Sequence, residues 1–336
     1  MKLTLVSPVS CCPKIPALAD RSILAALIII KLEKQSPFLL ACFFLFPALG
    51  SSGTATPIPF QCVGNLIVVE ATVNEQKGNF ILDTGAPGMI LNSSFFSGNK
   101  PYGREEAIYD IYGKKKSMDM LLIRSADING IRLPVVTAKI MDLSEYKKVK
   151  DVDLLGILGY DSFMDKQLVI DFKNNLLLLA DAGNPASLTG YTKADSVHFT
   201  LNGHLPCMKA TFAGKKYWFA LDTGSEVNIF HIYHLKGRAE HFRGSGRILL
   251  QGLGSAARMQ SKGWLKNIQF GQRFNDSLEV VLTDLVALNR IMKFQLDGLL
   301  GVPFLKERAI CIDYGHQKIY FLETVTIWAG AGQPGR

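Results

Sequence analysis

A short pattern occurs twice in this chain of 336 residues, and it constrains the fold more than any other feature. An apolar run ends in Asp-Thr-Gly at 80–85 and again, 139 residues later, at 219–224. At the same spacing and without a gap, Gly64 matches Gly203. Self-similarity of this extent indicates two copies of one structural unit.

A second block repeats at a nearly equal spacing. Gly-Ile-Leu-Gly at 156–159 matches Gly-Leu-Leu-Gly at 298–301, 142 residues later, and the match continues to 169–172 and 311–314. The two spacings differ by only three residues, so the insertions between the blocks nearly balance. We therefore expect two halves that fold alike and are related by a pseudo-two-fold axis.

Each Asp-Thr-Gly places a carboxylate at the end of a hydrophobic strand, followed by a hydroxyl residue and a turn-forming glycine. If two related halves meet at an axis, Asp83 and Asp222 share one site. Two carboxylates in one site do not both ionise easily, so they share a proton and act as acid and base on a water molecule. The alternative is two unrelated β-turn aspartates. The repeat of the second block favours the shared site.

The paired apolar-apolar-Asp-Thr-Gly and apolar-apolar-Gly elements resemble the pepsin/retropepsin class of aspartic proteases. The stretch at 297–305 is most similar to bacterial retropepsin-like proteins in a tandem, two-lobed form. The resemblance covers about residues 57–323. It implies an all-β acid-protease fold with two homologous β-barrel-like lobes, a pseudo-two-fold axis and a cleft between the lobes. It also implies that 157–159 and 299–301 close ψ-shaped loops beside the strands that carry the aspartates.

By the same resemblance, Asp83 and Asp222 are the catalytic residues. The threonines that follow them hydrogen-bond across the axis, and the glycines turn the backbone and bring amide donors toward the carboxylates. The residues expected to support the pair are Thr84, Gly85, Thr223, Gly224 and Ser225.

The two halves differ at the next position, where Ala86 matches Ser225. A hydroxyl there can donate to the carboxylate and lower its pKa, whereas alanine cannot. We therefore expect Asp222 to be the more acidic partner.

A cleft enzyme of this class needs a cover that excludes water and holds the substrate as an added strand. The candidates are 109–114 in the first half and 250–255 in the second, which both lie between the Asp motif and the apolar-apolar-Gly block. An ordinary hairpin turn is the alternative for each. The candidate flap residues are Tyr112, Gly113, Gly252, Leu253 and Gly254.

The charge pattern does not indicate a nucleic-acid partner. Residues 1–50 supply +3 of the formal net charge of +8, and the densest basic run is at 114–116. No basic stripe with interleaved aromatic residues accompanies that run, so a solvated loop is expected there.

Cysteine and histidine usage indicates neither a disulfide framework nor a metal centre. Beyond residue 50 there are three cysteines, an odd number, so we expect small buried hydrophobic side chains at Cys62, Cys207 and Cys311. The histidines at 231, 234 and 241 lack a Cys or acidic partner that would complete a site, and are expected on the surface or in loops. No metal and no cofactor are predicted.

The N-terminal region is typical of an export signal. Lys31 and Lys34 precede an apolar run at 38–49, and small residues follow at the expected cleavage point after Gly50. The run is shorter than the roughly 20 residues that span a bilayer. We predict a periplasmic or secreted protein. The alternative is a lipid anchor at Cys42, although apolar residues continue beyond that cysteine, and membrane association is expected only with a lipid or a retained signal.

The expected domains are an export signal at 1–50, an N-terminal lobe at 51–186, a C-terminal lobe at 187–328 and a frayed tail at 329–336. A linker is expected from 182 to about 196, and short helices at 164–167 and 306–308. Short apolar or alternating runs predict strands at 66–73, 79–82, 168–171, 176–179, 205–212, 217–221, 309–313 and 318–322.

Taken together, the sequence predicts an aspartic endopeptidase that works as a monomer on extended polypeptides. Two alternatives remain open. One is a non-catalytic peptide-binding or scaffold protein that retains the fold. The other is a homodimer in which lobes of two chains pair.

Overall fold

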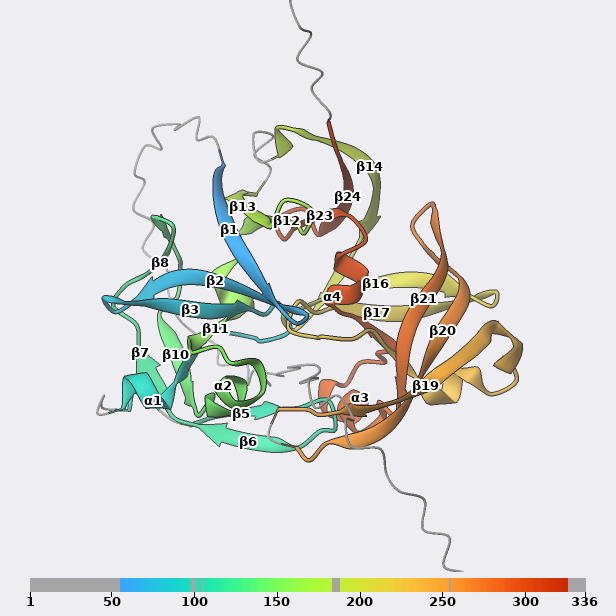
Figure 1. The fold of residues 1–336 in the computed structure, drawn as a ribbon, viewed down its shortest axis with the longest axis horizontal. Helices are drawn as coiled ribbons and strands as arrows, with labels where there is room; N and C mark the ends of the chain where they lie inside the picture. Colours follow the sequence, from blue (N-terminus) through green and yellow to red (C-terminus); the bar gives the residue numbers. More distant parts are fainter. Residues whose placement is uncertain (1–54, 98–100, 104, 183–187, 254, 326–336) are drawn as a thin grey trace, which may run out of the picture.

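The computed structural model describes residues 55–97, 101–103, 105–182, 188–253 and 255–325. The expected export signal, the Cys42 lipidation site and the expected tail lie outside the described residues. Figure 1 shows two β-rich lobes side by side, the first in blue to green and the second in yellow to orange.

The elements of the first lobe, in chain order, are β1 (Thr56–Val63), β2 (Leu66–Val73), β3 (Gln76–Leu82), β4 (Ile90–Asn92), α1 (Ser93–Phe96), β5 (Glu106–Tyr109), β6 (Lys115–Met118), β7 (Met120–Leu122), β8 (Ala126–Ile128), β9 (Ile131–Arg132), β10 (Thr137–Met141), α2 (Ser144–Lys150), β11 (Leu154–Leu158), η1 (Tyr160–Ser162), β12 (Lys166–Asp171) and β13 (Leu176–Asp181).

Those of the second lobe are β14 (Tyr191–His198), β15 (Thr200–Asn202), β16 (Leu205–Phe212), β17 (Lys215–Leu221), β18 (Ile229–His231), η3 (Ile232–Leu235), η4 (Ala239–His241), β19 (Phe242–Leu250), β20 (Arg258–Phe270), β21 (Arg273–Thr283), α3 (Val286–Met292), β22 (Gly298–Leu300), α4 (Val302–Leu305), β23 (Ala309–Asp313) and β24 (Lys318–Thr324).

The repeat in the sequence is a repeat in the structure. β2 and β16 have the same burial pattern at every position, because matching apolar side chains face matching cores. In each lobe this strand pairs with the strand that ends at an aspartate, β3 in the first lobe and β17 in the second. The all-β, two-lobed fold expected from the sequence is therefore confirmed.

One sheet joins the lobes, in the order β14-β24-β23-β12-β13-β1, and is drawn at the top of Figure 1. Its central strands β12 and β23 are antiparallel, with Val169 opposite Cys311. These two residues are separated by 142 positions, the spacing of the second repeated block. Equivalent residues face each other only at a two-fold axis, so the pseudo-two-fold axis passes between Val169 and Cys311.

The apolar-apolar-Gly blocks lie beside the strands that carry the aspartates. β11 runs parallel to β3, with Ile157 next to Ile81, and β22 runs parallel to β17, with Leu299 next to Ala220. β4 and β18 run antiparallel to the same inner strands. This arrangement is the ψ-shaped loop that the resemblance implies.

The strands predicted from the sequence are present, but three other expectations are wrong. β12 begins at Lys166, so 164–167 is not a helix, and the short helix η1 lies earlier, at Tyr160–Ser162. Residues 306–308 follow helix α4, which ends at Leu305. The linker does not reach 196, because β14 begins at Tyr191. Many β14 side chains are exposed, so the strand has no continuous apolar face that the sequence could reveal. It is held in place by pairing with β24.

The cysteine prediction holds for Cys207 and Cys311, which are buried and free, but not for Cys62, which is exposed. In its strand, β1, the alternation that buries Ile58 and Phe60 does not continue, and Gln61 and Cys62 are both exposed. Within the described ranges, none of the helices combines the length and apolar character needed to cross a membrane.

Candidate active site

Asp83 and Asp222 each follow the last residue of a buried strand, and neither side chain is exposed to solvent. Their backbone amides continue the pairing of the inner strands, since Asp83 N donates to Leu158 O and Asp222 N to Leu300 O, both at 2.9 Å. The strand pairing therefore fixes where each aspartate leaves the sheet.

Each carboxylate lies against the glycine of the opposite loop. A Cβ added to Gly85 would overlap the carboxylate of Asp222, and a Cβ added to Gly224 would overlap that of Asp83. Only glycine allows this close approach. The structure thus brings together the two aspartates that the sequence pairs.

Thr84 and Thr223 hydrogen-bond across the axis, as the resemblance implies. Thr84 N donates to Thr223 Oγ1 at 2.9 Å, and Thr223 N donates to Thr84 Oγ1 at 3.1 Å. Each hydroxyl in turn donates to a carbonyl at the end of the opposite strand, Leu82 O at 2.9 Å and Leu221 O at 3.4 Å. The four buried hydrogen bonds hold the two loops in one geometry.

Loop amides hold one oxygen of each carboxylate. Gly85 N and Ala86 N donate to Asp83 Oδ1 at 2.8 and 3.0 Å, and Gly224 N donates to Asp222 Oδ1 at 2.9 Å. The Oδ2 atoms of both aspartates are buried and have no hydrogen-bond partner among the residues that the structure describes. The site therefore presents two carboxylate oxygens to whatever it binds.

Burial raises the pKa of both carboxyl groups above the ordinary value for aspartate. For Asp83 the neighbouring charge of Asp222 raises the pKa further, because two like charges in one buried site repel each other. For Asp222 the burial effect is opposed first by the N–H group of Gly224, which donates to its Oδ1. The pair is therefore arranged to retain a proton between its two carboxyl groups.

The expected role of the Ser225 hydroxyl is wrong. Ser225 Oγ donates its single proton to Val227 O at 2.7 Å and so does not donate to Asp222. The support that Ser225 gives is through its backbone N–H group, which lowers the pKa of Asp222. The hydroxyl on which the expected acidity of Asp222 rested is therefore not available to that carboxylate.

The first flap candidate is the tip of the β5–β6 hairpin, which reaches from the first lobe toward α3 of the second, as Figure 1 shows. Tyr112 Oη donates to Leu250 O at 2.9 Å, and Gly113 lies against Ala287 and Ile291 of α3. The guanidinium of Arg258 stacks 4.0 Å from the centre of the Tyr112 ring. The tip of this first-lobe hairpin thus contacts the second lobe.

The second flap candidate lies between β19 and β20 and meets the first. Ile111 is fully buried in an apolar cluster of second-lobe residues and contacts Gly252, while Leu253 packs on a cluster of first-lobe residues. Ile111 and Leu253 are 142 positions apart, so they are equivalent residues that the two flap tips exchange. Gly254 lies outside the described residues.

The sequence analysis placed Asp110 and Ser255 in the two flap candidates but did not predict the contact between them. Ser255 Oγ donates to the buried carboxylate of Asp110, which ties the two tips together. The helix α2, also missed, supplies two buried side chains. Burial and then the charge of Asp83 raise the pKa of Tyr146, and Lys150 Nζ lies 2.7 Å from Glu226 Oε2. The only sequence signal for these residues is their place between the repeated blocks.

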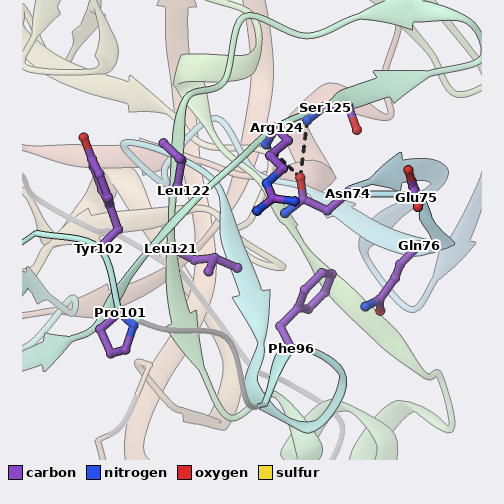
Figure 2. A pocket seen from close by; sticks show the side chains of 10 residues that line it. All are labelled: Asn74, Glu75, Gln76, Phe96, Pro101, Tyr102, Leu121, Leu122, Arg124 and Ser125. Atoms are coloured by element: carbon purple, nitrogen blue, oxygen red, sulfur yellow. Dashed lines mark hydrogen bonds between the residues drawn. The ribbon is translucent and has the colours of Figure 1, made fainter.

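A cavity of about 600 Å³ lies in the first lobe, away from the aspartates. Figure 2 shows Asn74 at its wall, with Oδ1 accepting hydrogen bonds from the backbone of Arg124 and Ser125. None of its lining residues belongs to an aspartate loop or a flap tip, so this cavity is not the candidate active site. The lining residues are Asn74, Glu75, Gln76, Phe96, Pro101, Tyr102, Leu121, Leu122, Arg124 and Ser125.

The expectation that the three histidines all lie on the surface or in loops is wrong. His231 is 5% exposed, and its Nδ1 lies 3.3 Å from Thr283 O. His234 Nε2 lies 2.6 Å from Asp297 Oδ1. In the part of the chain that the structure describes, no group of three His, Cys, Asp or Glu side chains is placed to hold a metal ion.

The duplicated lobes, the ψ-shaped loops and the threonines that hydrogen-bond across the axis form a two-lobed arrangement that resembles the pepsin/retropepsin class. Residues 69–162, which include Asp83, the first flap tip and Gly159, match the family model described as aspartyl protease. This match confirms the resemblance to pepsin/retropepsin-like aspartyl proteases.

Comparison with solved structures finds the aspartic proteinase from Irpex lacteus, with a TM-score of 0.48 and 11% sequence identity. The alignment covers 83% of this chain and 100% of that chain. No curated protein matches this chain.

Proposed function

We propose that this protein is an aspartic endopeptidase in which Asp83 and Asp222 activate a water molecule for attack on a peptide bond. One observation carries the proposal. Two buried carboxylates from equivalent loops are each held by loop amides through Oδ1, while both Oδ2 atoms lack a partner among the described residues. Such a pair offers the water one proton acceptor and one proton donor.

The roles of the two aspartates differ. Asp222, ionised, takes a proton from the water as the water oxygen attacks the peptide carbonyl carbon. Asp83, protonated, donates its proton to the carbonyl oxygen, which gives a neutral tetrahedral diol. The diol then breaks down: the proton taken by Asp222 passes to the leaving nitrogen, and Asp83 regains a proton from a diol hydroxyl. The net reaction consumes one water and one peptide bond.

The proposed substrate is a polypeptide in extended form. The flap tips at Tyr112 and Gly252 contact each other, and we propose that the substrate lies between these tips and the aspartate loops, with backbone groups on both sides. An extended segment satisfies such groups as an added strand. Because one chain supplies both aspartates, we propose that the monomer is active, and the apolar run at 38–49 supports the proposal that it acts after export.

The test is hydrolysis of a diverse peptide library by the purified 51–336 protein, with and without pepstatin. Asp83→Asn and Asp222→Asn should each lower turnover by at least about a thousandfold, because each removes one half of the proton-sharing pair. The exposed Asp119→Asn is the matched control and should retain full activity. Circular dichroism and Tm establish that all three variants are folded.

Near-normal turnover by either folded variant would exclude the two-carboxylate mechanism. Tight binding of peptides or pepstatin by wild-type protein without turnover would instead support the non-catalytic peptide-binding alternative.

A further inference from the structure

A histidine from the second lobe contacts the aspartate loop of the first. His204 lies in the two-residue turn between β15 and β16, where Gly203 takes a φ of +61°. Its side chain is 5% exposed, and Nε2 lies 2.8 Å from Gly85 O. A carbonyl oxygen only accepts hydrogen bonds, so the neutral ring must carry its proton on Nε2 and donate it to Gly85.

The carbonyl that His204 holds belongs to the peptide unit that binds the Asp83 carboxylate. The other end of that peptide is Ala86 N–H, which donates to Asp83 Oδ1 at 3.0 Å. Hydrogen bonds in series polarise one another in a buried site, so a donor on Gly85 O makes Ala86 N–H a stronger donor to the carboxylate. His204 therefore acts on Asp83 through one peptide group.

The second aspartate loop is held differently. The residue that matches His204 in the repeat is Asn65, in the equivalent turn between β1 and β2. Asn65 Nδ2 donates to Glu226 O at 2.8 Å, two residues beyond Gly224. The contact to the first loop is thus a departure from the two-fold symmetry, and it falls on only one of the two aspartates.

We propose that His204 is a positioning residue for the Asp pair, which holds the Gly85–Ala86 peptide from the opposite lobe and thereby sets the orientation and acidity of Asp83. The proposal rests on the proposed peptidase function for its kinetic consequences. It makes the protonation state of the pair depend on a contact between the lobes.

The surroundings keep this ring neutral. The groups that face it are Gly85 of the first loop, the Tyr160 ring at 6.5 Å between centroids, and the charge of Lys139 on β10. Burial, and to a lesser degree Lys139, lowers the pKa of His204 to about 4. Above that pH the ring is a neutral N–H donor, so its effect on Asp83 does not vary between pH 5 and 8.

The experiment compares His204→Leu, which removes the donor, with His204→Gln, whose amide can restore it, and with the exposed His198→Leu as the matched control. His204→Leu should raise the alkaline limb of the pH profile by about half to one pH unit. It should also lower kcat by about threefold to tenfold with little change in KM, because one hydrogen bond to the loop is lost. His204→Gln should recover most of both effects, and His198→Leu should match the wild type.

The carboxyl pKa of Asp83, followed by ¹³C NMR titration, gives a second measurement that needs no turnover. It should rise in His204→Leu and return toward the wild-type value in His204→Gln. If His204→Leu does not fold, His204→Asn, whose shorter amide does not reach Gly85 O, replaces it in both measurements.

An unchanged alkaline limb and an unchanged Asp83 pKa in the folded Leu or Asn variant would overturn the proposal and leave His204 a packing residue. A wild-type protein without peptidase activity would contradict the proposed function alone, since the NMR titration would still decide the role of His204.

Discussion

The two aspartates make the folded protein less stable at neutral pH. Burial raises the pKa of both carboxyl groups in the folded state above the value of about 3.9 that they have in an unfolded chain. Between these values the folded state binds more protons than the unfolded state. The free energy of unfolding therefore falls as the pH rises from about 4 through the folded pKa values.

Replacing both carboxyl groups should remove this loss of stability at neutral pH. The Asp83→Asn/Asp222→Asn variant should have a higher Tm than wild type at pH 8, and the difference should shrink toward pH 4. One pKa unit corresponds to about 1.4 kcal/mol, and 1 kcal/mol shifts the Tm of a chain of this size by about 2–4 °C. We expect a difference of at least about 3 °C at pH 8, measured by differential scanning calorimetry.

The exposed Asp119→Asn serves again as control and should show no such pH dependence. A double variant that is equally stable or less stable than wild type at pH 8 would show that the pair is not desolvated in solution as it is in the structure.

At the scale of elements, the two flap tips are joined to each other and form the proposed cover of the site. Asp110 is 2% exposed, and its carboxylate accepts hydrogen bonds from Tyr112 N at 2.9 Å, from Lys114 N at 2.8 Å and from Ser255 Oγ. The first two bonds shape the tip of the first flap, and the third joins it to the second. If the protein is the proposed peptidase, substrate entry would require the third bond to break while the first two can remain.

Ser255→Ala should therefore open the cover without unfolding either hairpin. A hydrogen bond to a charged group contributes about 1.5–3 kcal/mol, so the opening equilibrium should increase by about tenfold or more. Hydrogen exchange of the Tyr112 hydroxyl, which donates to Leu250 O of the second tip at 2.9 Å, reports this opening. Ser117→Ala, an exposed change on β6 of the same cover, should leave the exchange rate unchanged. Equal exchange rates in both variants would show that the hydrogen bond from Ser255 to Asp110 does not hold the two tips together.

The sequence predicts the elements that the repeat marks and misses those that lie between the repeated blocks. The aspartate strands end in apolar residues, and the inner strands β11 and β22 carry the buried apolar-apolar-Gly blocks, so pattern and repeat agree on them. Helices α2 and α3 are only seven residues long and have no side-chain N-cap, which leaves little local signal. The aspartate pair was therefore predictable, whereas Tyr146 and Lys150 were not.

The direction in which a side chain points could also not be predicted from the sequence. Ser225 differs from its equivalent, Ala86, by one hydroxyl. From the sequence pattern, the only partner that could be expected for this hydroxyl was the carboxylate of Asp222. The hydroxyl instead donates to Val227 O, and this hydrogen bond depends on the local backbone conformation. The contact of His204 depends on how the two lobes are placed, because the matching turn residue, Asn65, reaches a different carbonyl.

On the scale of the whole molecule, a buried ion pair joins the lobes beside the second aspartate loop. Lys150 and Glu226 have side chains only 5% and 3% exposed, and Asn65 N also donates to Glu226 Oε2 at 3.2 Å. Removal of one partner from a buried pair typically costs about 3–5 kcal/mol, because the remaining charge stays in a dry site.

Lys150→Met should lower the free energy of unfolding by about this amount, and the double variant Lys150→Met/Glu226→Gln should recover part of the loss. Urea denaturation measures both, and the exposed Lys148→Met on the same helix is the control. A loss in the double variant as large as the sum of the two single losses would show that the pair is not coupled.

The pairing of Val169 with Cys311 has a consequence for synthesis of the chain. When the first lobe has left the ribosome, the edge of β12 still lacks β23, which follows 142 residues later. Until then a strand buried on both faces has unpaired backbone donors and acceptors, the kind of edge on which a second nascent chain can add. Because the axis crosses this edge, two first lobes can pair their β12 strands in the geometry of the native sheet. We expect such a half-length dimer to compete with native folding of the chain.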